Sequence, residues 1–308
     1  MLHPAVFLGA GLLDETVGDP EGWPHPVRAF GWVITRLDVA RSPVNSPALL
    51  HGLGLLLALG LPLLAGVFAW GLLHLCGPWA WMAQMILGAW MLAGRSLRDA
   101  VKPVAEALSA GDLDAARHAV SRVVGRDTAH LDEAEVVRAG LETLAESLCD
   151  GVVAPLFWFV LGGLPGLWAF KAASTLDSMV GHHETPWTHF GWASARLDDC
   201  LNWVPARITA LLIAISSGSW RAVRHAMRDG GKTLSPNAGV VEAAFAGALG
   251  VQLGGTNLYD GVPKAGPLLG NPGLRLDGQV LRVGLRLSLR VNLAALLFGA
   301  SLLWRPHG

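Results

Sequence analysis

The longest uncharged stretch of this sequence runs from Ser42 to Gly94, where no Asp, Glu, Lys or Arg occurs. An α-helix needs about 20 apolar residues to cross the hydrocarbon core of a bilayer. The stretch therefore has room for two crossings, interrupted at Cys76-Gly77-Pro78. Two further uncharged stretches, Gly151 to Phe170 and Val291 to Trp304, are each long enough for one crossing or slightly less. A soluble protein would need an unusually large core to bury all of them, so the sequence predicts an integral membrane protein.

The composition supports this prediction. Only 15% of the 308 residues are charged and 52% are hydrophobic, with a mean hydropathy of +0.43, whereas soluble domains carry roughly 25% charged residues. The net charge of −1 and the lack of a basic patch argue against nucleic-acid binding. The three cysteines are widely separated, which indicates neither a disulfide framework nor a zinc site.

We predict an all-α, polytopic membrane protein with about four to five transmembrane helices in a single membrane-embedded domain. The expected segments are an N-terminal apolar run with a Pro-rich loop (1–47), a transmembrane hairpin (48–93), amphipathic cytoplasmic helices (94–150), membrane segments flanking an Asp-rich loop (151–219), a basic cytoplasmic loop (220–290) and a C-terminal span (291–308). The apolar run lacks the basic start and cleavage site of a signal peptide, so we expect it to be retained.

Three amphipathic helices are expected between Arg95 and Asp150. Their apolar stripes are Leu97, Val101, Val104 and Leu108 in the first, Ala115, Ala119 and Val123 in the second, and Leu141, Leu144 and Leu148 in the third. Thr128 or Asp132 would cap the third helix.

The stretch Gly151 to Ala173 is interrupted by Gly162-Gly163-Leu164-Pro165-Gly166, which disfavours one continuous helix. It is either a kinked single span or a re-entrant helical hairpin that returns the chain to the side from which it came. Lys and Arg flanking the spans place the loop from Trp220 to Arg290 and the block after Arg95 in the cytoplasm. Segment 174–202 contains only one basic residue near its ends, Arg196, so the count of Lys and Arg favours a position outside the cell. The phosphate chemistry that its polar residues suit favours the cytoplasmic side instead. A cytoplasmic position requires the re-entrant hairpin.

Glu142, Glu146 and Asp150 follow one another at helical i, i+4 and i+8 positions. Like charges at this spacing repel each other by a few tenths of a kcal/mol per pair. A solvated helix face tolerates that repulsion. A bound Mg²⁺, or amide and ammonium groups of a substrate, would relieve it.

A second polar group lies between two apolar segments, where ionisable residues indicate a functional site. It comprises Lys171, Asp177, His189, Arg196, Asp198 and Asp199. Carboxylates that bind Mg²⁺ beside Lys and Arg suit the handling of phosphate. The neighbouring His182-His183-Glu184 invites a zinc interpretation, but its spacing matches no standard zinc motif.

Two more polar segments have simpler explanations. Asp14 to Pro20 contains a Gly-Asp-Pro turn. Ser235 to Gly250 is rich in small residues, which allow close helix packing. Gly231-Lys232-Thr233 resembles the end of a phosphate-binding P-loop, but Ala226 stands where that motif requires glycine and no strand precedes it.

Taken in order, these segments resemble the CobD/CbiB family from Asp14 to about Gly270. The resemblance is carried by Gly125-Arg126-Asp127-Thr128, Asp150-Gly151-Val152-Val153-Ala154-Pro155-Leu156, Thr175 to Gly181, His189 to Asp199, and Ser235-Pro236-Asn237-Ala238-Gly239. The N-terminal apolar run is shorter than expected for that family.

The resemblance implies a ligase of cobalamin biosynthesis in the cell inner membrane, with its active site on the cytoplasmic face. A carboxylate of adenosylcobyric acid would be joined to (R)-1-amino-2-propanol or its O-phosphate by an amide bond, with ATP as co-substrate and Mg²⁺ as cofactor. The corrinoid, the amino alcohol and the bilayer are the expected partners; other corrinoid-pathway enzymes and a second copy of the chain are compatible with the sequence.

The roles that follow from the resemblance are hypotheses for individual residues. Asp177, Asp198 and Asp199 would hold Mg²⁺ and ATP, with Lys171 and Arg196 on phosphate oxygens and His189 as a base. Glu142, Glu146 and Asp150 would hold a second cation or the amine. The residues expected to contact substrate or brace loops are Asp14, Asp19, Arg126 and Asn237.

Three other classes of protein are alternatives. A transporter would need polar residues at mid-depth in the spans, whereas the ionisable groups here crowd at the span ends. A CDP-alcohol phosphatidyltransferase would also use paired Asp residues, but the Ala-Arg pair expected after Asp150-Gly151 is absent. A non-catalytic scaffold for corrinoid enzymes is the third alternative.

Overall fold

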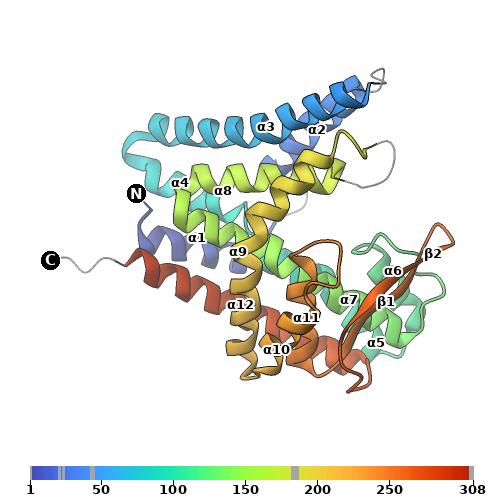
Figure 1. The fold of residues 1–308 in the computed structure, drawn as a ribbon. Helices are drawn as coiled ribbons and strands as arrows, with labels where there is room; N and C mark the ends of the chain where they lie inside the picture. Colours follow the sequence, from blue (N-terminus) through green and yellow to red (C-terminus); the bar gives the residue numbers. More distant parts are fainter. Residues whose placement is uncertain (1, 20–21, 23–24, 42–45, 182–186, 305–308) are drawn as a thin grey trace. The chain divides into compact units, whose positions relative to one another are not determined.

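The computed structural model describes residues 2–19, 22, 25–41, 46–181 and 187–304. The chain divides into two compact units (Figure 1). Unit 1 comprises Met1–Ala93, Ala154–Asn202 and Leu296–Gly308, and unit 2 comprises Gly94–Val153 and Trp203–Ala295. The segment His182-His183-Glu184, considered above for zinc, lies outside the described residues.

Unit 1 is built from long apolar helices. They are α1 (Pro4–Val17), α2 (Pro26–Arg41), α3 (Pro47–Cys76), α4 (Ala80–Ala89), α8 (Ala154–Val180), the start of α9 (Trp192–Ser217) and the end of α12 (Gly278–Leu303). Helix α1 packs against α4, while α2 and α3 pack against α8. The buried side chains along these faces are mostly Ala, Leu and Phe, so apolar packing contributes much of the stability of this arrangement.

Helix α8 is two antiparallel arms rather than one rod. Gly163 has φ +59° and ψ −155°, a conformation that only glycine adopts readily. A Cβ on Gly166 would lie 2.8 Å from the carbonyl oxygen of Trp158, which shows that the chain folds back on itself. At 1.5 Å per residue the first arm, residues 154–162, is about 14 Å long, too short to cross a bilayer. The geometry is that of the predicted helical hairpin.

Four helical stretches among the described residues are long and apolar enough to cross a membrane. They lie within Pro47–Ser109, Glu133–Val180, Trp192–Ser217 and Gly278–Leu303. Helix α3 fulfils the prediction for the first arm of the hairpin at 48–93. The second arm was predicted too long: a short 3₁₀ turn (Gly77–Trp79) leads into α4, which has only 10 residues. The C-terminal helix was predicted too short, since α12 begins at Gly278 rather than at residue 291.

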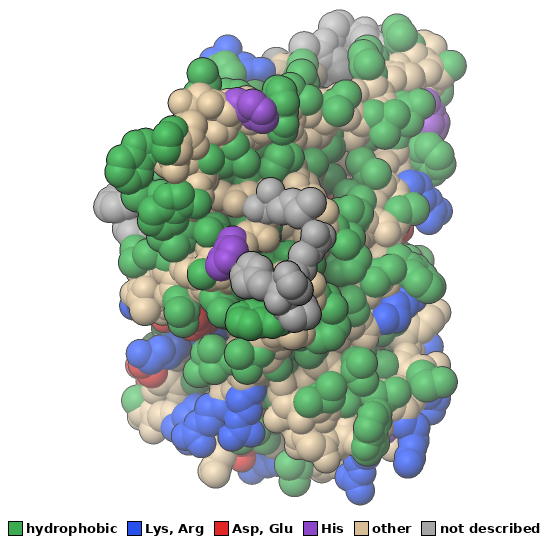
Figure 2. Space-filling model, turned by 90° about the vertical axis from the view of Figure 1, so that its left-hand side faces the viewer, with side chains coloured by type: hydrophobic (Ala, Val, Ile, Leu, Met, Phe, Trp, Pro, Cys, Tyr) green, Lys and Arg blue, Asp and Glu red, His purple; other side chains and the backbone are tan. Residues whose placement is uncertain are grey.

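The surface of α3 is what a lipid-facing helix requires. Leu56, Leu63 and Leu64 are each 66–70% exposed, along with many other apolar side chains of this helix. Figure 2 likewise shows a face on which hydrophobic side chains are widespread and acidic ones are few. Exposed apolar surface on this scale is unfavourable in water and favourable in a bilayer.

Unit 2 is centred on α7 (Glu133–Leu148), which contacts α5 (Gly94–Ser109), α6 (Leu113–Ser121), α11 (Ala238–Leu249) and the first strand. The predicted stripes of α5 and α7 are confirmed, apart from Leu108, which is only half-buried. In α6 the prediction was wrong by one position: Ala116 and Val120 are buried, while Ala115 is exposed. Asp132, not Thr128, caps α7, in a reciprocal capping box with Glu135.

The segment 220–290 is ordered structure rather than the loop that the sequence predicted. It contains α10 (Arg221–Asp229), α11, an antiparallel hairpin of β1 (Gln252–Tyr259) and β2 (Val262–Gly270), and the start of α12. Asp260 and Gly261 both have positive φ, 51° and 76°, as the two central residues of a type I′ turn do. The Asp-Gly pair was the signal that could have predicted this hairpin.

Candidate functional site

A cavity of about 330 Å³ lies within unit 2, between α7, α11, the β-hairpin and the segment after α6. Its polar lining side chains are Arg126, Glu142, Thr143, Glu146, Thr233, Glu242, Asn257 and Tyr259. The cavity thus joins two of the polar segments predicted from the sequence, the one with Glu142 and Glu146 and the one from Ser235 to Gly250, across about a hundred positions of the chain.

Arg126 and Glu142 form an ion pair in the wall of this cavity, with side chains 9% and 10% exposed. Arg126 Nη1 also donates to Asn257 Oδ1 at 2.8 Å, and the second carboxylate oxygen of Glu142 accepts from the N–H of Gly254 at 2.8 Å. The desolvation cost of burying an ion pair is offset when further hydrogen bonds satisfy its other donors and acceptors, as these two bonds do. Both predicted residues therefore belong to one network.

Strand β1 reaches this ion pair through two glycines. Gly254 and Gly255 have φ of 79° and 98°, at a bulge in the pairing of β1 with β2. A Cβ on Gly254 would lie 2.0 Å from the carbonyl oxygen of Pro267. Arg138 bonds to the Gly254 carbonyl and donates to Asn257 Oδ1 at 3.0 Å. The glycines therefore allow the strand backbone to approach close enough for these hydrogen bonds.

Asp127, next to Arg126, holds the tip of the hairpin. Its carboxylate accepts hydrogen bonds from the N–H groups of Gly261 at 2.8 Å and Asp260 at 3.3 Å, and its own N–H donates to the Leu258 carbonyl at 2.9 Å. Within the Gly125-Arg126-Asp127 motif, Arg126 therefore belongs to the cavity wall, and Asp127 holds the turn of the β-hairpin.

Glu146 and Glu242 add two further carboxyl groups to the cavity. Glu242, on α11, is partly buried. Burial, together with the charges of Glu142 and Glu146, raises the pKa of Glu242 from 4.5 to about 8. Sequence analysis did not assign a role to Glu242, because its neighbours in the chain are small apolar residues and its acidic neighbours are more than ninety positions away.

Asp150 was predicted to continue the stack of Glu142 and Glu146. It lies instead in a π-helical turn, Cys149–Val153, which interrupts the α-helical register after α7. It is not among the residues that line the cavity.

Asn237 is buried in the loop before α11, where its Oδ1 accepts from Arg207 Nη1 at 2.7 Å. The Arg207 guanidinium also lies over the Trp203 ring, 4.6 Å from its centroid. The hydrogen bond with Arg207 ties the loop to α9, and the predicted substrate contact of Asn237 stays a prediction. The Thr233 side chain, which lines the cavity, donates to the Ser235 carbonyl in the same loop at 2.8 Å.

The predicted aspartates of unit 1 lie at two helix ends, not in a loop. Lys171 and Asp177 are on the second arm of α8, and Asp198, Asp199 and Asn202 are in the first turns of α9. A Cβ on Gly191 would lie 1.6 Å from the Val180 carbonyl oxygen, so glycine at this position lets the start of α9 approach the end of α8. Lys171, Asp177 and Asp199 all lie within electrostatic reach of Asp198.

Two oxygens of this cluster are buried without a hydrogen-bond partner among the described residues, Asp198 Oδ1 and Asn202 Oδ1. The same two side chains are bonded to each other through their other polar atoms. Asn202 Nδ2 donates to Asp198 Oδ2 at 2.9 Å. Asn202 is 1% exposed. Buried acceptors left without donors are costly unless a ligand or cation satisfies them.

The remaining predicted residues of unit 1 have other contacts. Arg196 is exposed and lies 3.7 Å from Asp199. The His189 ring lies against that of His51 in α3 in a tilted arrangement, with centroids 4.9 Å apart and 49° between the ring planes. Asp14 is buried in α1, and Asp19 lies 3.5 Å from His25.

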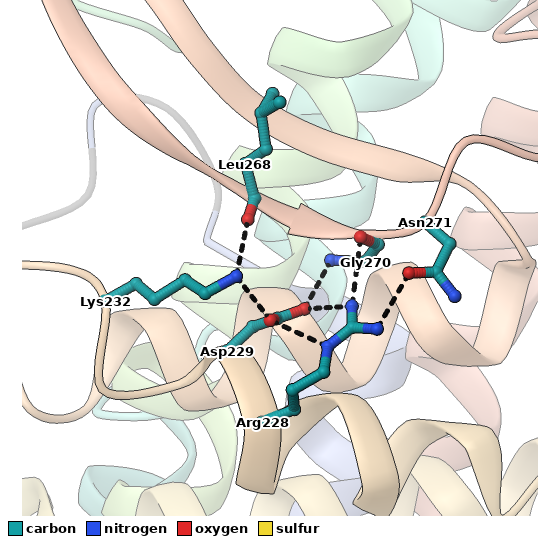
Figure 3. Close-up of polar contacts among 6 residues, drawn as sticks. All are labelled: Arg228, Asp229, Lys232, Leu268, Gly270 and Asn271. Atoms are coloured by element: carbon teal, nitrogen blue, oxygen red, sulfur yellow. Dashed lines mark hydrogen bonds and ion pairs between the residues drawn. The ribbon is translucent and has the colours of Figure 1, made fainter.

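A further charged cluster in unit 2 was not predicted at all (Figure 3). Asp229 is fully buried and accepts from Arg228, from Lys232 at 2.6 Å and from the N–H of Gly270 at 2.9 Å. Arg228 also donates to Asn271 Oδ1 at 2.8 Å. Since its groups satisfy one another, the cluster anchors the end of β2 on α10 and leaves no unsatisfied group for a ligand.

Within the described part of the chain, no three His, Cys, Asp or Glu side chains are grouped closely enough to form a complete metal site. The two unsatisfied oxygens beside Asp177 nevertheless suit a hard cation such as Mg²⁺, which takes few protein ligands and keeps several waters.

These features define a class: a helical protein with membrane-spanning helices and a buried polar cluster in each of its two units. A family model described as CobD/Cbib protein matches residues 7–288. The chain belongs to the CobD/CbiB family.

The curated relatives agree with this assignment. Cobalamin biosynthesis protein CobD of Geobacter metallireducens is 46% identical over 296 residues, covering 92% of this chain and 91% of the relative. The CobD protein of Pelobacter propionicus is 43% identical, with coverage of 94% and 92%. Cobalamin biosynthesis protein CbiB of Salmonella typhi is 41% identical, covering 85% of each chain. No solved structure matches this chain.

Proposed function

We propose that this chain is a membrane-bound ligase of cobalamin biosynthesis. It joins a carboxylate of adenosylcobyric acid to (R)-1-amino-2-propanol or its O-phosphate by an amide bond, in a reaction that uses Mg²⁺ and ATP. Membership of the CobD/CbiB family supports the pathway. The observation that carries the chemistry is the pair of buried, unpartnered oxygens of Asp198 and Asn202 beside Asp177 and Lys171.

The reaction needs activation, because a carboxylate does not condense with an amine in water. In the proposed sequence a carboxylate oxygen of the corrinoid attacks the γ-phosphorus of ATP and ADP leaves. The amine, having lost a proton, then attacks the acyl carbon and phosphate leaves with the C–O bonding electrons. Mg²⁺ would neutralise phosphate charge during the first transfer.

Different residues of unit 1 would bind the cation, the phosphate oxygens and the nucleotide. Asp177 and Asp198 would hold Mg²⁺, with the Asn202 amide oxygen as a further ligand that sequence analysis had not included. Lys171 would bind phosphate oxygens. Arg196 and Asp199, which lie together at the exposed side of α9, would orient the nucleotide. The assignment of His189 as a base stays a prediction.

We propose that this chemistry takes place on the cytoplasmic face of the inner membrane. ATP and the corrinoid intermediates are water-soluble, and the basic residues near the span ends favour that orientation. The folded-back geometry of α8 supports the same arrangement, because a hairpin returns the start of α9 to the side from which α8 entered.

The test uses the full chain purified in detergent. Incubation with adenosylcobyric acid, the amino alcohol or its phosphate, and Mg-ATP should give the amide, detected by mass spectrometry, and omission of ATP should abolish it. Asp198→Asn should lower turnover at least a hundredfold, whereas Asp114→Asn, at a side chain 90% exposed on α6, should not. Amide formation without ATP, or full activity of the Asp198 variant, would contradict the mechanism. Failure to form the amide under any condition would favour a transporter or a scaffold.

A further inference from the structure

We propose that a groove between α2 and α3 holds one acyl chain of an anionic phospholipid, with the phosphate of its headgroup at Arg36. The groove has a volume of about 430 Å³, and all the residues that line it belong to unit 1. None of them is a residue to which the ligation is assigned, so the inference does not depend on that proposed function.

The first argument is the lining of the groove, which is apolar throughout. Leucines of α3 form most of it, and Val33 and Leu37 of α2 complete it together with Phe190. These side chains offer water no hydrogen bonds. Gly60 of α3 also lines the groove, and a Cβ added there would meet nothing within 4 Å. Among the described residues, the protein therefore does not fill this space with its own side chains.

The second argument is the surroundings of the groove. Leu56 and Leu64 line it and are 70% and 66% exposed, on a helix within a stretch long and apolar enough to cross a membrane. In a bilayer, such a surface is surrounded by acyl chains. An empty groove would lose dispersion contacts along its walls. An acyl chain restores these contacts, whereas water does not.

The third argument is length. From Leu53 to Leu64, the two ends of the lining on α3, the helix rises by about 17 Å at 1.5 Å per residue. Half of the hydrocarbon core of a bilayer, which is the depth of one leaflet, is about 15 Å. The groove therefore matches the length over which one phospholipid extends its chains.

The fourth argument concerns the direction of the groove. Phe30 in the first half of α2 and Phe68 near the end of α3 both lie against the Trp168 ring, with centroids 6.0 Å away in each case. Helices α2 and α3 therefore run in opposite directions. Arg36, in the second half of α2, consequently lies toward the Leu53 end of the groove.

The groups at this end suit a phospholipid headgroup. The Arg36 guanidinium lies over the Trp32 ring, 5.0 Å from its centroid, and Trp32 is 61% exposed. Trp side chains are enriched at the headgroup level of membranes, and basic side chains there attract anionic lipids. The ring contact uses the face of the guanidinium, while phosphate oxygens accept from N–H groups in its plane.

The experiment measures lipid binding to the full chain, purified in detergent and titrated with phosphatidylglycerol or phosphatidylcholine, by native mass spectrometry. The unmodified chain should bind one phosphatidylglycerol about fivefold more tightly than phosphatidylcholine. Gly60→Leu places a side chain in the groove and should abolish this binding. The matched control is Gly71→Leu, on the same helix but outside the lining, where an added Cβ also meets nothing within 4 Å. It should bind as the unmodified chain does.

A second pair of variants tests the headgroup contact. Arg36→Gln should remove the preference for phosphatidylglycerol and leave the affinity for phosphatidylcholine unchanged. Arg122→Gln, at an exposed arginine of unit 2, should keep the preference.

A photoreactive lipid gives a measurement that needs no variant. Phosphatidylglycerol with a diazirine midway along one acyl chain should crosslink to Leu57 and Leu61, which line the groove. It should crosslink far less to Leu59 and Leu63, which are exposed on α3 outside the lining. Should Gly60→Leu fail to fold, the positions of the crosslinks decide the question.

The inference is overturned if the unmodified chain binds neither lipid, if Gly60→Leu binds phosphatidylglycerol as well as Gly71→Leu does, or if the Arg36 variant keeps the preference. Crosslinks spread evenly around α3 would overturn it too. A dimer that Gly60→Leu dissociates without a change in lipid binding would assign the groove to a second copy of the chain instead.

Discussion

At the scale of single residues, unit 2 depends on a few buried charges that are each bonded to several partners. Arg126 connects Glu142 to Asn257, and Asp127 holds the turn at Asp260 and Gly261. Sequence analysis identified Arg126 and Glu142 as functional candidates but could not pair them. Strand β1 fixes the pair, because Asn257 bonds to Arg126 and Gly254 bonds to Glu142 across more than a hundred positions of the chain.

Asp229 should be the residue of unit 2 whose charge matters most for stability at neutral pH. Hydrogen bonds from Arg228, Lys232 and the Gly270 N–H hold the pKa of the Asp229 carboxyl well below its usual range. Both basic partners are about half exposed, so we expect Asp229→Asn to lower the free energy of unfolding by on the order of 2–3 kcal/mol rather than more. Thermal unfolding in detergent at pH 7 measures this loss.

The direction of the pH dependence follows from the depressed pKa of Asp229. A carboxyl with a depressed pKa stabilises the folded state above its unfolded pKa of about 3.9, and this stabilisation is lost as the pH falls further. The difference between the unmodified protein and Asp229→Asn should therefore be full at pH 6–7 and shrink below about pH 4. Asp114→Asn, at an exposed site, should stay within about 0.5 kcal/mol of the unmodified protein. A constant difference across this range would argue against an ionic origin.

At the scale of elements, glycine conformations decide where helices reverse and where strands bend. The Gly-Gly-Leu-Pro-Gly sequence predicted an interruption of the helix after residue 161 but left open a kink or a hairpin. The contact of Gly166 with the Trp158 carbonyl decides for the hairpin. The β-hairpin, in contrast, was not predicted, since its strands are rich in glycine and lack the alternation of a half-buried strand.

Gly163→Ala should destabilise unit 1 because φ +59° with ψ −155° is open only to glycine. We expect a loss of about 1–3 kcal/mol in the free energy of unfolding, seen as a lower Tm in detergent. The matched control is the adjacent Gly162→Ala, where an added Cβ meets nothing within 4 Å. Equal melting temperatures for the two variants would show that the reversal does not depend on the Gly163 conformation.

At the scale of the whole molecule, the chain alternates between the two units. Residues 94–153 and 203–295 build unit 2, while the segments before, between and after them build unit 1. Exposed leucines of α3 and the four long apolar stretches mark the molecule as a membrane protein. The aspartates proposed for catalysis, Asp177 and Asp198, belong to unit 1, on α8 and α9.

Cysteine labelling should place the two polar segments on the same side of the membrane. In a variant with Cys76, Cys149 and Cys200 replaced by Ala, a cysteine introduced at exposed Thr188 should react with a membrane-impermeant maleimide only after the membrane is opened. A cysteine at Met227, 82% exposed on α10, serves as the cytoplasmic reference. Labelling of position 188 in intact cells, with position 227 protected, would contradict the re-entrant hairpin.

The sequence by itself determined the membrane class, the family resemblance, the α3 span, the apolar stripe of α7 and most of the residues proposed to act. These properties depend on local composition, on helical spacing or on short motifs, all of which can be recognised without knowing what packs against what. The tertiary structure alone decided that β1 bonds to the Arg126–Glu142 pair, that Glu242 shares their cavity, that oxygens of Asp198 and Asn202 are buried, and that Asp229 anchors β2. Each of these depends on which charges are removed from water together, and that is set by contacts between segments distant in the chain.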